Sequence, residues 1–313
     1  MPGLLAVFRK EMADHFSSKR FLIMFTLILL AGLSATYTAA QSIRSEVASA
    51  GEDSAFVFLM LFTVSSGALP SFVSFVGFLG PLVGLAMGFD AINGEYARGT
   101  LSRVLSNPIF RDSVINGKFL AGVATIAVLL LSIALLLAGL GLRMIGIPPT
   151  VDEVLRLTIY LFVSVVYVAF WMSLAILFSI LFRQTATSAL AGVPLWIFFT
   201  FFISMIAATT AAALVPVNEQ EPQTVLAHEY FRQGMARISP ATLYTETTMT
   251  ILIPSVRTLG PVTLGEVIGM IPGPLPLVQS LMVVWPQFVG LIAMTLVCFA
   301  ISYARFMRQE IRA

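Results

Sequence analysis

Residues 119–142, FLAGVATIAVLLLSIALLLAGLGL, decide the fold class because they form a long apolar run without a charged side chain. A helix that rises about 1.5 Å per residue crosses the ~30 Å hydrocarbon core of a bilayer with roughly 20 such residues. Five other stretches meet this criterion and contain no Asp, Glu, Lys, Arg or His: 21–41, 69–89, 157–182, 188–214 and 286–304. The sequence therefore predicts an all-α integral membrane protein with six transmembrane helices.

The composition of the whole chain agrees with this class. Of its 313 residues, 58% are hydrophobic and 11% are charged, whereas a soluble domain carries about 25% charged residues. The mean hydropathy is +0.93. The single cysteine, Cys298, excludes an internal disulfide framework and a cysteine metal cluster.

The distribution of basic residues predicts the orientation of the spans. If both termini are cytoplasmic, the inner segments contain 12 of the 18 Lys and Arg residues and only 6 of the 16 acidic residues. Cytoplasmic loops carry an excess of Lys and Arg. We therefore expect a multi-pass protein of the cell (inner) membrane with both termini in the cytoplasm.

Residues 1–20 predict an amphipathic elbow helix that lies in the membrane interface. Its apolar stripe has three- and four-residue spacing and consists of Leu5, Phe8, Met12 and Phe16. A cleaved signal peptide is the alternative, but Glu11 and Asp14 do not suit the n-region of such a peptide. Residues 56–64 either extend the second span or form a separate surface helix.

A long insert, residues 215–285, precedes the sixth span and is predicted to be extracytoplasmic. Ser239 and Pro240 have the residue types of an N-cap and a first helical position. Prolines interrupt the apolar stretch 262–284, so that it suits the outer leaflet better than a complete crossing. This insert is also a possible docking site for an extracytoplasmic partner.

Between the second and third spans, residues 95–111 read EYARGTLSRVLSNPIFR. Thr100 or Gly99 can cap a short helix, which Pro108 ends. Leu101, Val104 and Leu105 form one apolar side of that helix. Asp112 or Ser113 can cap the helix that continues into the third span. The pattern predicts a short cytoplasmic helix, and an ordinary amphipathic connector is the alternative.

These residues resemble the cytoplasmic signature of ABC-2 type transporter permeases. The matching positions are Glu95, Arg98, Gly99, Thr100, Leu101, Leu105, Ser106, Pro108, Arg111, Gly117, Lys118 and Leu120. Ala97 replaces a usual acidic residue, and Phe110 replaces a usual small polar one. The predicted six spans, elbow helix and outer insert resemble most the branch that includes the permease of the nitrous-oxide-reductase maturation system.

The resemblance implies one ABC-2 transmembrane domain over residues 1–313, with a coupling segment at 90–118. It also implies a cytoplasmic ABC ATPase subunit as partner and a second permease chain, in a homo- or heterodimer. The residues expected to couple this chain to the ATPase are Glu95, Arg98, Gly99, Thr100, Leu101, Val104, Leu105, Pro108, Arg111, Gly117 and Lys118.

Other motifs argue against chemistry within this chain. Gly117-Lys118 lacks the preceding glycine and the following Ser or Thr of a phosphate-binding loop, so that ATP and Mg²⁺ are expected on the partner. His228-Glu229 lacks the second histidine of a zinc-protease motif, since Arg232 occupies that position. We expect no catalytic residue, cofactor or metal site here, and no nucleic-acid partner.

Two functions from different classes remain open. The spans carry no ionisable residue, which disfavours a carrier coupled to protons or sodium and suits one energised by a partner ATPase. The first function is a permease subunit that exports amphipathic or lipid-like cargo. The alternative is a membrane anchor or assembly factor that couples an ATPase to an extracytoplasmic protein and transports nothing.

Overall fold

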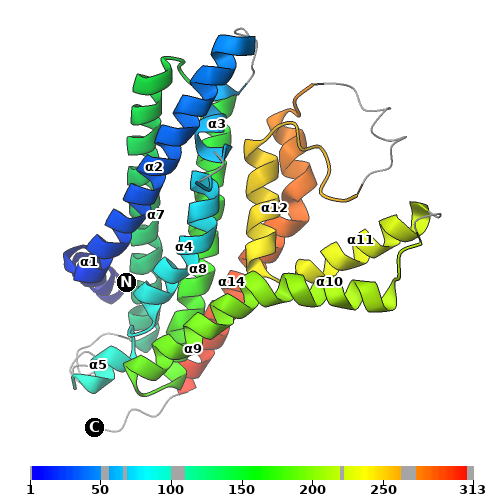
Figure 1. The fold of residues 1–313 in the computed structure, drawn as a ribbon. Helices are drawn as coiled ribbons and strands as arrows, with labels where there is room; N and C mark the ends of the chain where they lie inside the picture. The colour runs from blue at the N-terminus through cyan, green and yellow to red at the C-terminus, as the bar shows by residue number, and fades with distance from the viewer. Residues whose placement is uncertain are drawn as a thin grey trace. The chain divides into compact units, whose positions relative to one another are not determined.

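A computed structural model describes residues 2–50, 56–65, 69–99, 110–218, 222–261 and 273–308. Helices dominate these residues (Figure 1). Their bounds are α1 Pro2–Ser17, α2 Lys19–Ala50, α3 Val57–Thr63, α4 Phe72–Gly88, α5 Asn93–Ala97, α7 Arg111–Ile145, α8 Val151–Leu181, α9 Thr185–Ile197, the π-helix η1 Phe198–Phe202, α10 Ile203–Leu214, α11 Pro222–Ala236, α12 Pro240–Leu252 and α14 Leu277–Arg308.

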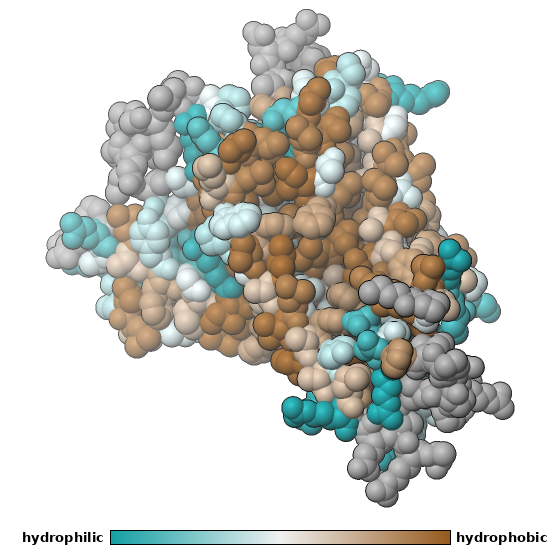
Figure 2. Space-filling model, turned by 180° about the vertical axis from the view of Figure 1, so that it is seen from behind, coloured by the Kyte–Doolittle hydropathy of each residue, from teal (hydrophilic) through white to brown (hydrophobic). Residues whose placement is uncertain are grey.

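Six helical stretches of the described chain are long and apolar enough to cross a membrane, which confirms the predicted number of spans. They are Lys19–Ser45, Phe72–Ala97, Arg111–Ile145, Val151–Leu181, Thr185–Leu214 and Leu277–Arg308. The last begins at Leu277 and contains Pro286, which the sequence suggested as its first residue. Figure 2 shows a face covered largely by apolar side chains, with hydrophilic residues toward its margins, as a lipid-facing surface requires.

The chain divides into two compact units, and the first contains residues 1–193 and 292–313. Within it, α4 packs most extensively on α8, and α1 packs along α7. Arg20 at the start of α2 bonds Asp90 just after α4, and Thr295 and Ser302 of α14 bond the carbonyls of Val166 and Ser173. Hence α2 and α4 are antiparallel, whereas α14 runs parallel to α8.

Small residues bring α4 and α8 into close contact. Gly80, Gly84 and Gly88 recur every four residues and therefore lie on one side of α4. A Cβ atom on Gly84 would lie 2.5 Å from the carbonyl oxygen of Val168, and one on Gly88 would lie 2.6 Å from that of Met172. Membrane helices commonly pack through such small residues because lipid supplies no hydrophobic force between them.

A polar region of this unit lies where α8 begins. Thr150 caps α8 in a capping box with Glu153, and Glu153 Oε1 also accepts the N–H of Phe58 at 3.0 Å. This bond holds α3 against α8. Helix α3 is therefore separate from the second span, as one alternative proposed, but its side chains from Val57 to Phe62 are mostly buried and do not form a surface helix.

The second unit contains residues 194–291. Ser239 caps α12, with Pro240 at its first position, which confirms the predicted helix start. The Ser239 hydroxyl also donates to the carbonyl of Phe199 in η1 at 2.7 Å. Glu246 of α12 accepts from Arg237, Gln233 and Gln287, so that one carboxylate joins α11, α12 and the first part of α14.

Candidate functional site

The candidate site is a buried ion cluster in the first unit, and Lys118 of α7 is at its centre. Its ammonium lies 2.8 Å from Glu11 Oε1 of α1 and 2.8 Å from Glu95 Oε1 of α5. The side chains of Lys118 and Glu95 are both only 6% exposed. One cation therefore binds carboxylates from two other helices, including the helix that leads into residues 100–109.

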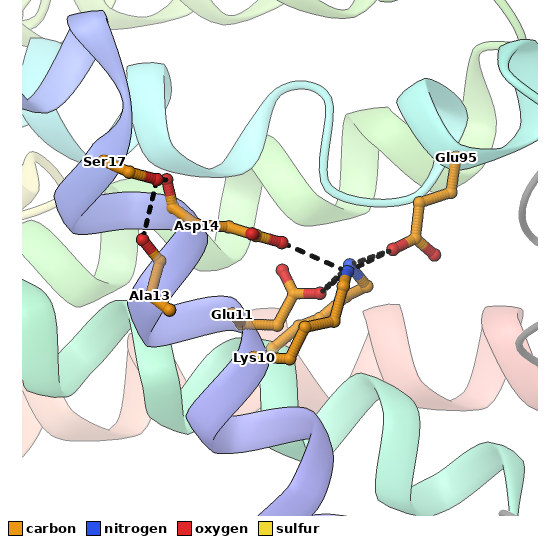
Figure 3. A network of polar contacts seen from close by, with 7 residues as sticks. Lys10, Glu11, Ala13, Asp14, Ser17 and Glu95 are labelled. Atoms are coloured by element: carbon orange, nitrogen blue, oxygen red, sulfur yellow. Dashed lines mark hydrogen bonds and ion pairs between the residues drawn. The ribbon is translucent and has the colours of Figure 1, made fainter.

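A second lysine extends this cluster toward the surface. The Lys10 ammonium lies 2.9 Å from Glu11 Oε1, 3.2 Å from Asp14 Oδ2 and 3.4 Å from Glu95 Oε1. Figure 3 shows Glu11 and Asp14 of α1 and Glu95 of α5 directed toward this ammonium. Because the Lys10 side chain is 54% exposed, it completes the cluster at the edge of the buried region.

Gly117 explains how α1 comes close enough to make these bonds. A Cβ atom at Gly117 would lie 2.8 Å from Cγ1 of Val7, which is closer than real Cβ contacts allow. Val7 and Glu11 are four residues apart, so they occupy the same side of α1 and both are buried. The pair Gly117-Lys118 thus supplies the close approach in one residue and the charge in the next.

The position of Glu95 depends on α8. The Ser179 hydroxyl accepts the backbone N–H groups of Ile92 and Asn93 at 2.9 and 3.1 Å. The amide of Asn93 donates to the carbonyl of Phe182 at 3.2 Å. These bonds fix the first turn of α5 to α8. Glu95 is therefore positioned both by its own ion pair with Lys118 and by the backbone that carries it.

The cluster perturbs the titration of its members on α1. Burial by itself raises the pKa of Glu11, but the charge and hydrogen bond of Lys118 outweigh it and hold the pKa below the ordinary value. Burial likewise lowers the pKa of Lys10, yet its hydrogen bond and attraction to Glu11 raise that pKa overall. At neutral pH both groups are charged, and the cluster is a set of ion pairs.

Burial lowers the pKa of His15, next to the cluster on α1. The carboxylates of Glu11, Asp90 and Asp14 oppose this effect, whereas the charge of Lys118 adds to it. His15 therefore favours its neutral form in the folded protein.

The face that α1 packs on α7 is not its predicted apolar stripe. Leu5 and Phe16 of the stripe are 47% and 40% exposed, whereas Val7 and Glu11 are buried. The two surfaces of α1 thus differ in role: one is buried against α7, and the other presents large apolar side chains outward.

The structure brings together three of the predicted coupling residues, Glu95, Gly117 and Lys118. Arg98 and Gly99 follow α5 and are exposed, and Gly99 has a φ of +64°, which favours glycine. Arg111 is the first residue of α7. Thr100, Leu101, Val104, Leu105 and Pro108, with the predicted short helix, lie outside the described residues.

The predicted cap of α7 is wrong. Phe110, in extended conformation, is its N-cap and makes no side-chain bond to the helix. Asp112 lies in the first turn, where its Oδ1 accepts the N–H of Ser113 at 2.7 Å. A negative charge in the first turn complements the helix dipole. Asp is therefore favoured in the first turn as well as at the cap, and the sequence alone does not separate the two positions.

Sequence reasoning missed Glu11, Lys10 and Ser179 as parts of the site. One signal was present: Lys118 directly precedes an apolar span, and a lysine at such a depth requires a partner. Glu11 lies four residues from Val7 and therefore on the same side of α1. Nothing local in the sequence pairs residue 11 with residue 118, since the contact is long-range.

The side chains of this cluster connect helices to one another and do not form a reaction centre. Within the described ranges, no three His, Cys, Asp or Glu side chains are placed to hold a metal ion. The carboxylates that face one another, Glu11 and Glu95, already share the ammonium of Lys118. What the arrangement does is bind α1, α5 and α7 to one another.

Comparison with known proteins agrees with the signature in this region. The model of the ABC-2 family transporter protein matches residues 5–311 of the chain. A probable ABC transporter permease protein NosY from Pseudomonas aeruginosa is 28% identical over 211 residues, which cover 66% of this chain and 70% of the relative. A protein with the same description from Stutzerimonas stutzeri is 37% identical over 92 residues, 27% of this chain and 33% of the relative.

Proposed function

Because the chain is a multi-pass membrane protein that belongs to the ABC-2 transporter family, we propose that it forms the translocation pathway together with a second permease chain, identical or related. A separate ABC ATPase subunit drives the pair and supplies the ATP and Mg²⁺ chemistry. The ATPase binds residues 90–118, and this end of the first unit faces the cytoplasm. Both termini are then cytoplasmic, and the membrane is the inner membrane.

The observation that carries this proposal is the ion cluster on both sides of residues 100–109. Glu95 precedes this segment, Lys118 follows it, and their charged groups lie 2.8 Å apart. Glu11 adds α1 to the same cation. A force applied to residues 100–109 therefore acts on α1, α5 and α7 together.

The cluster gives the coupling step a physical basis. ATP binding shifts the permease between two states only if the ATPase binds the two states with different affinity. Because Glu95 and Lys118 fix α5 to α7, these two helices move together when the ATPase acts on residues 100–109, and the difference in affinity reaches the spans. Buried ion pairs suit this role because separating the two charges would leave each of them uncompensated in a low-dielectric environment. The helices that carry these charges therefore stay together.

The cargo that we propose is amphipathic or lipid-like. The fifth span and η1 present large apolar side chains outward, among them Leu190, Phe198, Phe201 and Met205. Apolar and hydroxyl side chains offer little to a small ion and suit a molecule with an acyl or aromatic part. Residues 215–285 then lie outside the membrane, where a partner protein has access to them.

The direct test is to co-express the chain with its ATPase and compare two variants. Leu101→Asp places a charge in the expected ATPase contact. Val151→Asp is the matched control, since Val151 is 78% exposed at the start of α8. We expect Leu101→Asp to insert normally but to lose co-purification with the ATPase or transport, and Val151→Asp to keep both. Normal association and transport in Leu101→Asp would refute the proposed coupling role.

The same assembly separates transport from the anchor or assembly function. Substrate-stimulated ATP hydrolysis in proteoliposomes supports a permease. Stimulation by an extracytoplasmic protein alone, with no movement of cargo, supports an assembly factor instead.

A further inference from the structure

A cavity of about 400 Å³ opens beside the ion cluster in the first unit. Helices α1, α2, α4, α7 and α8 all contribute to its wall. Its volume falls within the roughly 300–1,000 Å³ of small-molecule sites. The cluster holds the helices together, but nothing in that role requires an adjoining space of this size.

The wall of the cavity changes in chemistry along its length. One part of the wall is charged and contains Lys19, Arg20, Asp90 and Arg98 together with the members of the ion cluster. The open apolar part includes Met24, Ala86 and Met87, which are partly exposed. Val83, Leu129 and Met172 also border the cavity but are only 2%, 1% and 1% exposed, so that the open space ends at them. The cavity thus has a charged part and an apolar part.

The cations of the charged part differ in their partners. Lys118 is bound by Glu11 and Glu95, and Arg20 by Asp90 at 2.7 Å. Lys19 and Arg98 are exposed, and among the described residues no ion pair includes either of them. Two cationic side chains therefore line the charged part of the cavity.

Of the possible occupants, one has both properties. An inorganic anion satisfies the cations but leaves the apolar depth empty, and water gains little in an apolar space. A peptide strand would bury backbone groups without partners. We infer that the cavity binds one glycerophospholipid from the adjacent leaflet, with its phosphate beside Lys19 and Arg98 and the first part of one acyl chain against Met24 and Met87. This inference does not depend on the proposed ATPase contact.

Native mass spectrometry of the purified full chain tests the inference. Delipidated protein is titrated with phosphatidylglycerol, once with and once without millimolar inorganic phosphate. Lys19→Ala removes one cation, and Ala86→Phe fills the cavity from α4, whose Ala86 lines it. Two matched controls lie outside the lining, Arg9→Ala on α1 and Ala127→Phe on α7.

We expect wild type and both controls to bind one lipid per chain saturably. Lys19→Ala should lower the affinity about fivefold, as expected for one basic residue near a lipid surface. Ala86→Phe should abolish saturable binding. Equal lipid retention in all five proteins would overturn the inference, and so would complete displacement by inorganic phosphate, which would indicate a simple anion site.

A second measurement guards against misfolding of Ala86→Phe. Wild-type protein in phosphatidylglycerol vesicles is irradiated with a phospholipid that carries a diazirine in its acyl chain. Adducts concentrated on the segments around Met24 and Met87 support an acyl chain in the cavity. Adducts spread evenly over the lipid-facing helices would contradict it.

Discussion

The two polar regions of the first unit both contain a buried carboxylate and a buried cation, yet they are built differently. Where α8 begins, Glu153 completes its own capping box and Arg156 bonds Asp152 four residues away. At the ion cluster, Lys118 bonds Glu11 and Glu95, which are 107 and 23 residues away. The first region stabilises one helix end and holds α3, whereas the second joins helices from distant parts of the chain.

This difference predicts different consequences of mutation. Local caps are replaceable at modest cost because water or the backbone can take over their bonds. Removing only the cation that two buried carboxylates share costs much more, because it leaves negative charges in a low-dielectric environment. We therefore expect the ion cluster to dominate both stability and coupling, and the α8 cap to affect stability alone.

The largest effect is expected from Lys118→Met, which keeps the apolar length of the side chain and removes its charge. Breaking a buried pair costs about 3–5 kcal/mol. Since Lys10 lies 2.9 Å from Glu11, we expect a value near 3 kcal/mol. Thermal unfolding in detergent measures it, with Lys10→Met as the control, because that half-exposed lysine should contribute about 1 kcal/mol or less.

A triple variant sharpens this result. Lys118→Met combined with Glu11→Gln and Glu95→Gln removes the buried charge of Lys118 and those of its two carboxylate partners, and should recover most of the lost stability. If the cluster couples residues 100–109 to the spans, ATPase-driven transport should stay impaired in this variant. An unfolding temperature of Lys118→Met that stays close to the wild-type value would show that the cluster does not hold these helices together.

Gly117→Ala is expected to have the next largest effect, because its new methyl group would meet Val7. Overpacking typically costs about 1–3 kcal/mol. Gly139→Ala on the same helix is the matched control, since a Cβ there has no heavy atom within 4 Å and gains up to about 1 kcal/mol of helix propensity. Unfolding temperatures that shift in the same direction for both variants would contradict the close approach of α1.

How much of this was predictable follows from the range of each interaction. The six spans and the Ser239-Pro240 helix start depend on local composition and spacing, and the structure confirms them. Glu95 and Lys118 were predicted from one motif, but their partner Glu11 was not, because a contact across 107 residues leaves no local pattern. The cap at Asp112 was misplaced by two residues because first-turn and cap preferences overlap.

The α8 cap should give a smaller effect that is confined to stability. Thr150→Ala removes the hydroxyl that accepts the N–H of Glu153 at 3.3 Å, and loss of such a cap costs about 1 kcal/mol. Thr158→Ala, whose exposed hydroxyl bonds a carbonyl within α8, is the control and should change stability little. Substrate-stimulated ATP hydrolysis should be normal in both; a loss of coupling in Thr150→Ala would remove the distinction between the two regions.

The smallest expected effect is a change in the pH dependence of stability, which arises at His15 beside the ion cluster. Burial keeps the pKa of His15 below its ordinary value of 6.5, so that the unfolded chain takes up a proton before the folded protein does. Stability should therefore fall as the pH drops below 6.5, by less than about 1 kcal/mol at pH 6. Glu11 has a lowered pKa, and its contribution is lost only near and below pH 4.5. The stability of His15→Gln between pH 7 and 5.5 should thus depend less on pH than that of wild type. A wild-type slope retained in His15→Gln would assign the pH dependence to another group.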